Sequence, residues 1–161
     1  MDSLDQWIDA LDSPSLLERI TADVTLMRAG ADAVEPLLAC LNDPLQPLEM
    51  RWRAAVNLGS IGDGRALEAL ITALNDEAWE IRHSAAWALG RLADQRGFAA
   101  LVAFVEHPLV DEQIPYVIAM ALIDIDQAAA QQVLQRALNS PHEDVRSWAH
   151  SALLNLDFVA V

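Results

Sequence analysis

Four histidines and one cysteine are the side chains of this 161-residue sequence best suited to metal binding or nucleophilic chemistry. Two metal ligands on one helical face need a spacing of three or four residues, and no pair of these histidines has it. The cysteine lies in a leucine-rich stretch, where a small buried thiol is expected rather than a nucleophile. A metal site assembled from distant parts of the chain stays the alternative. We therefore expect no catalytic residue, cofactor or metal among His83, His107, His142, His150 and Cys40.

A second group of residues suits contact with a protein, because Trp, Tyr, Met and Arg are enriched at the centres of protein interfaces. The group comprises Trp52, Val56, His83, Trp87, Tyr116 and Met120, with Arg28, Arg91 and Asp124 at its rim. The alternative is that its aromatic members fill gaps between helices, which is the role we expect for Trp79 and Trp148. The register of the helices decides between a binding face and a filled gap.

The elements that must position these residues are repeats of about 31 residues. Residues 50–63 read MRWRAAVNLGSIGD, and residues 81–94 read IRHSAAWALGRLAD in the same frame. A central leucine recurs in steps of 32, 31, 33 and 31 residues, at Leu26, Leu58, Leu89, Leu122 and Leu153. A second ladder of similar period runs through Leu11, Leu41, Leu74, Val105 and Leu138. Two ladders with one period indicate two helices in each repeat.

Apolar residues at three- and four-residue spacing place these helices along the chain. First helices are expected at residues 3–12, 33–42, 65–75, 96–107 and 127–139, and second helices at 14–28, 48–61, 78–92, 110–124 and 142–156. Ser13-Pro14, Asp43-Pro44 and Ser140-Pro141 are predicted to cap the starts of second helices, and Gly30 and Gly62 to end them.

One helix pair cannot bury its apolar stripe alone, whereas stacked pairs share a continuous core. The sequence therefore predicts an all-α solenoid of about five helix pairs. We expect one domain with units at residues 1–30, 31–62, 63–93, 94–125 and 126–161.

The shared frame of apolar-Arg, Ala-Ala, Leu-Gly and Asp, followed by Arg65-Ala66-Leu67, resembles the HEAT-like repeat of phycobilin lyase subunits and many other bacterial proteins. The resemblance implies that the second helix of each pair lines a concave surface. It also implies structural roles for the signature residues of the repeat, here Arg19, Arg51, Arg82, Arg146, Asp63 and Asp94. Such an arginine is expected to bond an acid or a carbonyl of the preceding turn. The fourth unit departs from the frame, with Pro115 at the arginine position.

The formal charge of −14, from 24 acidic and 10 basic residues, disfavours several classes of partner. Nucleic acids and anionic membranes require neutralisation by Lys and Arg, so neither is expected to bind. The longest apolar run of note has ten residues, whereas a membrane-spanning helix needs about 20. A single cysteine permits no intramolecular disulfide and favours a cytoplasmic location.

These features predict a non-catalytic scaffold, adaptor or chaperone whose concave face binds a protein partner with a basic or apolar patch. The first alternative, implied by the resemblance alone, is a bilin lyase or bilin-handling protein, with Arg28 and Arg91 for the propionates of an open-chain tetrapyrrole. The second is a factor that holds a client during metalloprotein assembly. Nucleic-acid repair, known for some HEAT-like solenoids, conflicts with the negative charge.

Overall fold

A computed structural model of the chain describes residues 4–105 and 114–159, apart from the side chains of residue 115 and of residues 155–159. His107 and the side chain of Pro115 therefore lie outside the described part. Every regular element in these ranges is helical. The elements form pairs: α1 (Leu4–Asp9) with α2 (Leu16–Ala29), α3 (Val34–Asn42) with α4 (Leu48–Ile61), α5 (Leu67–Ala73) with α6 (Trp79–Leu92), α7 (Gln95–Val105) with α8 (Ile114–Ile125), and α9 (Gln127–Ala137) with α10 (Glu143–Val159).

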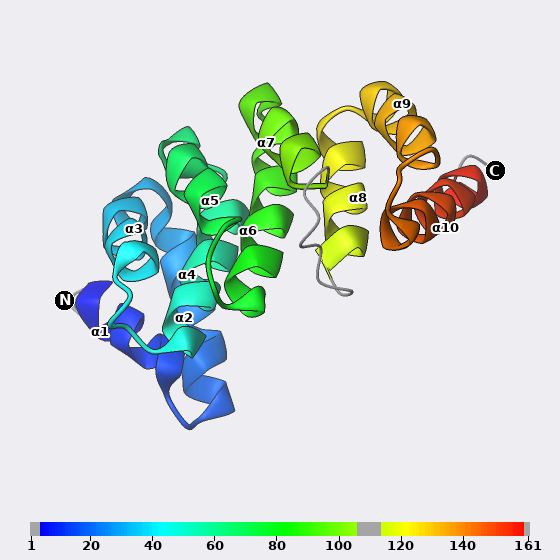
Figure 1. Ribbon diagram of the computed structural model, residues 1–161. Helices are drawn as coiled ribbons and strands as arrows, with labels where there is room; N and C mark the ends of the chain where they lie inside the picture. The colour runs from blue at the N-terminus through cyan, green and yellow to red at the C-terminus, as the bar shows by residue number, and fades with distance from the viewer. Residues whose placement is uncertain (1–3, 106–113, 160–161) are drawn as a thin grey trace.

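The pairs stack side by side into a curved row, which confirms the predicted all-α solenoid. Figure 1 shows the first helices α3, α5, α7 and α9 along the outer side of the curve and the second helices along the inner side. The most extensive contacts join α4 to α6 and α6 to α8, so successive second helices form the centre of the stack. Short 3-10 turns at Ala10–Asp12, Gly30–Ala33 and Gly64–Ala66 complete the first three pairs.

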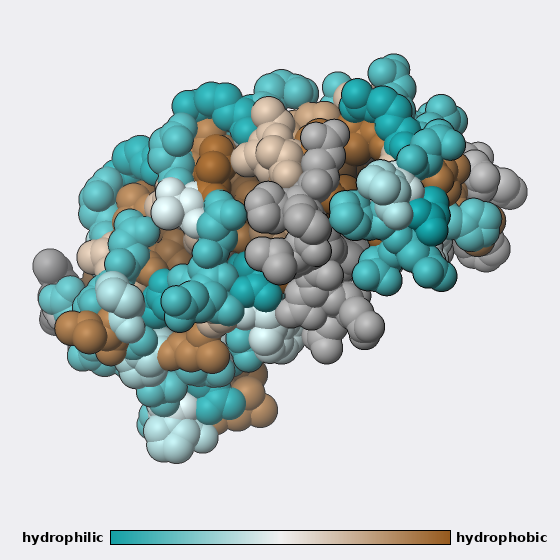
Figure 2. Space-filling model, viewed as in Figure 1, coloured by the Kyte–Doolittle hydropathy of each residue, from teal (hydrophilic) through white to brown (hydrophobic). Residues whose placement is uncertain are grey.

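A continuous hydrophobic core runs between the two rows of helices. The leucines at the centre of the second helices, Leu26, Leu58, Leu89 and Leu122, are fully buried, and Leu11, Leu41, Leu74 and Val105 of the other ladder are also buried. On the face seen in Figure 2, polar residues cover the helix pairs and hydrophobic side chains show in the gaps between successive pairs. Among the described residues, no helix is both long and apolar enough to cross a bilayer.

The Leu-Gly step of the repeat lets neighbouring second helices approach to backbone contact. A Cβ atom built on Gly59 of α4 would lie 2.6 Å from Cα of Ala88 in α6, and one on Gly90 would lie 2.8 Å from Cα of Ala121 in α8. Real Cβ atoms do not approach so closely, so only glycine fits these positions without moving a helix. The spacing of the inner helices is therefore set by main-chain contact.

The starts of α2, α4, α6 and α10 lie within two residues of the predicted ones, and the predicted ends at Gly30 and Gly62 are confirmed, whereas the predicted start caps are wrong. Gly30 and Gly62 follow α2 and α4 with positive φ angles of 58° and 74°. By contrast, α2, α4 and α10 begin two to five residues after the predicted Ser-Pro or Asp-Pro caps. Side-chain oxygens of Ser13, Asp43 and Ser140 instead accept from the backbone N–H two residues on, at 3.1, 2.9 and 3.2 Å. A turn held in this way competes with the helix, which then starts later.

Candidate binding pocket

Four residues of the predicted interface group meet in one pocket on the inner side of the stack. The pocket lies between α4 and α6 and has a volume of about 600 Å³. Helix α4 contributes Trp52 and Val56, and α6 contributes His83 and Trp87 together with Trp79, Glu80 and Ser84. A space of this size with mostly apolar walls and a few polar groups is typical of a ligand site.

The other predicted members of the interface group are exposed but lie outside this pocket. Tyr116 and Met120 of α8 are 61% and 39% exposed, and Trp87 is 36% exposed. Arg28, Arg91 and Asp124 are exposed as well. The structure therefore brings together Trp52, Val56, His83 and Trp87 and leaves the remaining five residues apart from them. Binding of a partner by this face stays a prediction.

Trp79 corrects one expectation, because it lines the pocket instead of filling a gap in the core. It is the first residue of α6, and 40% of it is exposed. Its ring packs edge-on against His83, with ring centroids 6.2 Å apart and planes at 77°. The four-residue spacing of Trp79 and His83 places both on the same helical face, which is the pocket face. The matching expectation for Trp148 is confirmed, since that side chain is 8% exposed.

The charge of the pocket comes from one carboxylate. Burial lowers the pKa of His83 below its ordinary value of 6.5, so its imidazole is mainly neutral near pH 7. Glu80 is the remaining ionisable group in the pocket wall. It makes no side-chain hydrogen bond or ion pair with any residue that the structure describes. The pocket thus combines three tryptophans with one carboxylate that has no cation beside it.

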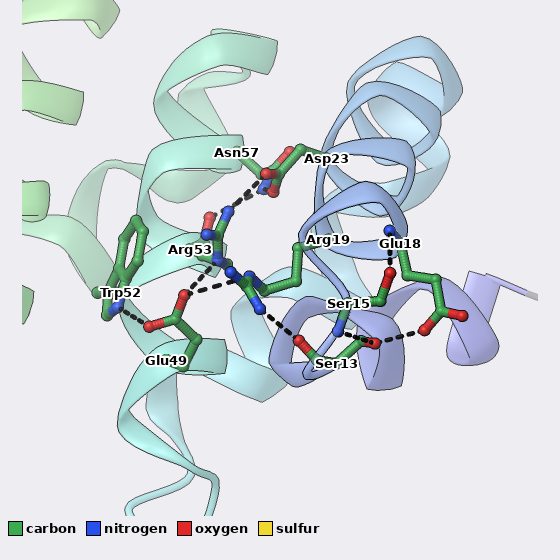
Figure 3. A network of polar contacts seen from close by, with 9 residues as sticks. All are labelled: Ser13, Ser15, Glu18, Arg19, Asp23, Glu49, Trp52, Arg53 and Asn57. Atoms are coloured by element: carbon green, nitrogen blue, oxygen red, sulfur yellow. Dashed lines mark hydrogen bonds and ion pairs between the residues drawn. The ribbon is translucent and has the colours of Figure 1, made fainter.

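The neighbouring groove between α2 and α4 is filled by its own ion pairs (Figure 3). Arg53 Nε donates to Glu49 Oε1 at 2.7 Å, and Arg53 Nη1 donates to Asp23 Oδ2 at 2.7 Å. Asn57 Nδ2 donates to Asp23 Oδ1 at 2.7 Å, and Arg19 Nε lies 3.8 Å from Glu49 Oε1. The carboxylates of this groove are therefore paired with cations across two repeats, whereas Arg19 Nε and Asn57 Oδ1 are buried without a hydrogen-bond partner among the described residues.

Trp52 connects this network to the pocket. Its Nε1 donates to Glu49 Oε2 at 3.1 Å, and the guanidinium of Arg53 lies 4.6 Å from the centre of its ring. Because two partners hold this side chain, it is oriented before any ligand arrives. The sequence analysis missed Glu49, Arg53 and Glu80; the four-residue Glu-Arg spacing and its loss in the next repeat were the available signals.

The repeat-signature arginines bond the loops that precede the second helices. Nη1 of Arg19, Arg82 and Arg146 donates to the backbone carbonyl six residues earlier, at 2.6, 2.8 and 2.7 Å. Arg51 differs, since its Nε donates to the Leu41 carbonyl at 3.1 Å and its Nη2 to Asp76 of the next repeat at 2.6 Å. A guanidinium that donates to a carbonyl of the preceding loop holds the start of the second helix against that loop.

The signature aspartates form a second, outer ladder. Asp63 and Asp94 each accept from the backbone N–H two residues on and from the side chain of the same arginine, Arg65 or Arg96. Hydrogen bonds from Arg65 hold the pKa of Asp63 at about 2, and those from Arg96 lower the pKa of Asp94. Both arginines also reach a glutamate of the preceding pair, Glu35 and Glu68.

The residues first considered for catalysis do not converge. Cys40 is buried, and desolvation raises the pKa of its thiol to about 11, which disfavours a thiolate nucleophile. His142 and His150 are exposed on or beside α10, far along the chain from the pocket. Within the described ranges, no three side chains of His, Cys, Asp or Glu are grouped so as to hold a metal ion.

Comparison with known proteins identifies the family. The family model described as HEAT repeats matches residues 34–114, which are 81 of the 161 residues. The chain belongs to the HEAT-repeat family. Its matched region includes both walls of the pocket. The resemblance proposed from the repeat frame is thereby confirmed.

Curated relatives of this HEAT-repeat chain are named for an enzyme. Deoxyhypusine hydroxylase of Drosophila melanogaster is 26% identical over 120 residues, which are 74% of this chain and 40% of that protein. The hydroxylase of Arabidopsis thaliana is 31% identical over 122 residues, 73% of this chain and 38% of that protein. The chain thus spans about 40% of the length of the curated relatives that it matches.

Solved structures share the fold over nearly the whole chain. The complex of CpcE and CpcF of phycocyanin lyase from Nostoc sp. PCC7120 has a TM-score of 0.65 and 26% identity, and covers 95% of this chain and 64% of that chain. Human deoxyhypusine hydroxylase in complex with glycerol has a TM-score of 0.64 and 22% identity, and covers 93% and 60%. The second likeness shows the fold alone.

The comparisons overturn the functional prediction made from the sequence. A non-catalytic scaffold, adaptor or chaperone was expected first, with a bilin lyase or a metalloprotein-assembly factor as alternatives. The curated relatives are instead named as a hydroxylase, which points to an enzyme and contradicts a non-catalytic role. The bilin-lyase alternative is not contradicted in the same way, because a phycocyanin lyase complex is among the solved structures that share this fold. The prediction from the sequence was wrong because no catalytic residues are recognisable within this chain alone. A HEAT-repeat fold does not by itself reveal which reaction a protein takes part in.

Proposed function

We propose that this chain is the substrate-holding part of an enzyme, and that the pocket between α4 and α6 receives a side chain of a protein substrate. The observation that carries this proposal is the convergence of Trp52, Trp79 and Trp87 from two successive repeats on one pocket of about 600 Å³. The names of the curated relatives support an enzyme, and hydroxylation is the reaction to test first.

The reacting group of such an enzyme has to come from outside the described residues. Insertion of oxygen from O2 requires a metal or an organic cofactor. The described side chains do not fit a metal centre, since no three suitable ligands lie together in them. A chain that spans about 40% of its relatives leaves room for such a centre in a further polypeptide segment or a second chain.

A protein partner agrees with this arrangement. The phycocyanin lyase neighbour is itself a complex of two chains. The inner side of this solenoid exposes Tyr116 and Met120 beside the pocket helices, residues of the kind enriched at protein interfaces. We include in the proposal a partner surface that is apolar or basic, and a cytoplasmic location, because the acidic chain has one cysteine, which is buried.

The test uses the chain with whatever it assembles with. The tagged chain is purified from its native cells together with its bound partners, deoxyhypusine is supplied, and mass spectrometry follows the gain of one oxygen. We expect conversion by the wild type and a loss in kcat/KM of roughly thirtyfold or more in Trp52→Ala/Trp87→Ala, because truncated anchors of this kind cost about 2 kcal/mol. Leu45→Ala, at a 91% exposed position outside the pocket and outside the predicted interface group, is the control.

Two outcomes would contradict the proposal in different ways. Absence of any conversion by the assembled wild type rejects the hydroxylase reaction. Equal conversion by the wild type and the folded double variant rejects the pocket as the place where substrate is held.

A further inference from the structure

The pocket carboxylate differs from its counterpart in the preceding repeat by the loss of one cation. Glu49 and Glu80 are 31 residues apart and occupy equivalent places at the starts of α4 and α6. Glu49 is neutralised by Arg53, four residues on, at 2.7 Å. The residue four after Glu80 is Ser84, which leaves Glu80 without a partner in the described part of the chain.

We propose that the pocket between α4 and α6 binds an alkylammonium group, such as a lysine-type side chain of a protein partner, with Glu80 as its counter-ion. This inference rests on the proposed function and names the chemistry of the group that the site holds. The incoming cation takes the electrostatic role that Arg53 has in the neighbouring groove.

The aromatic walls suit the same ligand. Indole rings attract a cation placed over their faces, and three of them line this pocket as Trp52, Trp79 and Trp87. Helix α4 already contains one such contact, with the Arg53 guanidinium 4.6 Å from the centre of the Trp52 ring. The volume of about 600 Å³ admits an aliphatic stem along the indole rings as well as the charged head.

The charges around the pocket oppose an anionic ligand. No Lys or Arg lines the pocket, and burial keeps His83 mainly neutral near pH 7. The first turn of α6 would attract an anion, but Glu80 itself already occupies that turn. The whole chain has a net charge of −14, which favours the approach of a cation.

The test compares three small probes of equal length on the full chain: n-butylammonium, 1-butanol and butyrate. The indole N–H signals of the five tryptophans are followed by NMR during each titration. We expect shifts in Trp52, Trp79 and Trp87 only, with Trp7 and Trp148 as internal controls. A cation–aromatic contact together with an ion pair predicts binding of the ammonium roughly tenfold tighter than the alcohol, and weakest binding of butyrate.

A pair of matched variants isolates the counter-ion. Glu80→Gln keeps the shape of the side chain and removes its charge, so it should reduce the preference for the ammonium to the part that the indole rings supply, while leaving the affinity for 1-butanol unchanged. Glu77→Gln makes the same change in net charge at an exposed position that does not line the pocket, and it should leave the preference intact.

The outcomes separate this inference from the proposed function. Equal binding of ammonium and alcohol, or an unchanged preference in Glu80→Gln, overturns the cation site but leaves an apolar substrate pocket. Tighter binding of butyrate than of the ammonium, or no tryptophan shift with any probe, also overturns the inference. The hydroxylation assay fails or succeeds independently of these titrations.

Discussion

Two adjacent grooves on the inner side of this solenoid have opposite chemistry. Between α2 and α4, Glu49 and Asp23 share Arg53 as their cation. Between α4 and α6, the place of Arg53 is taken by Ser84, and Glu80 lines a pocket with three tryptophans and has no cationic partner among the described residues. The exchange of Arg53 for Ser84 is therefore one difference between a groove that holds its own ion pairs and one that is open to a ligand.

The comparison teaches that function in a repeat protein is best sought in departures from the repeat. Residues that match the repeat frame have structural roles. Gly59 and Gly90 allow close contact between helices, and Arg19 and Arg82 bond the loops before the second helices. Where an ion pair of one repeat loses a member in the next, the remaining charge is left for a ligand or solvent to neutralise.

The largest expected effect is that of a substitution at Gly59, where the backbone of α4 contacts α6. Gly59→Ala forces α6 away from α4, because the new Cβ would lie 2.6 Å from Cα of Ala88. We expect a loss of about 3 kcal/mol in the free energy of unfolding, measured in urea. Gly64→Ala, where nothing lies within 4 Å, is the control and should change stability by less than about 0.5 kcal/mol. Equal stability of both variants would show that the helices do not touch at Gly59.

Removal of Arg53 breaks the closed groove. Arg53→Ala leaves Glu49 and Asp23 without their shared cation, and the side chain it removes is only 14% exposed. We expect a loss of about 1–2 kcal/mol, because partly buried charge-assisted bonds are lost and their partners stay behind. Arg91→Ala, on the exposed surface of α6, should cost far less. If the two variants unfold at the same urea concentration, the network contributes nothing to stability.

Transfer of the arginine to the next repeat should close the open groove. Ser84→Arg restores the four-residue pairing with Glu80. Ser84 is 5% exposed but lines the pocket, so we expect the arginine to extend into that space at a cost of about 1 kcal/mol in stability. Binding of n-butylammonium, followed by tryptophan NMR, should be lost, whereas Ser84→Ala should bind it as the wild type does. Undiminished binding by the folded Ser84→Arg variant would show that the two grooves are not equivalent.

The smallest effect concerns pH. Burial lowers the pKa of His83 in the folded chain below 6.5, so the unfolded chain takes up this proton first as the pH falls. The contribution of His83 to stability is therefore fully present above pH 6.5 and is lost as the pH falls through the lower folded pKa. Thermal unfolding between pH 7.5 and 5 should show a weaker pH dependence for His83→Gln than for the wild type. His150→Gln, at an exposed position of α10, controls for the loss of one imidazole.

The fold could be predicted from the sequence because the same leucine spacing recurs in five repeats, so that a wrong assignment at one position does not change the predicted architecture. The caps of α2, α4 and α10 were misassigned, since a Ser-Pro or Asp-Pro pair suits a turn as well as a helix cap. Gly30 and Gly62 were placed correctly after helix ends, because they occupy positive φ angles that few other residues adopt.

The pocket was predictable only in part. Alignment of the repeats placed Trp52, Val56, His83 and Trp87 in neighbouring rows, and the structure brings these four into one site. Trp79 was assigned to the core because its residue type dominated the argument, although its spacing from His83 placed it on the pocket face. Glu80 was not predicted as a site residue. What distinguishes it is the lack of an arginine four residues later, and this difference can be recognised only once Glu49 and Arg53 are known to pair.

Contact between main chains at Gly59 and Gly90 has a consequence for how this surface can vary. These contacts set the distances from α4 to α6 and from α6 to α8, so the spacing of these helices does not depend on the size of side chains that line the pocket, such as Glu80. New ligand preferences at this pocket then arise by single substitutions while the helices around it keep their places.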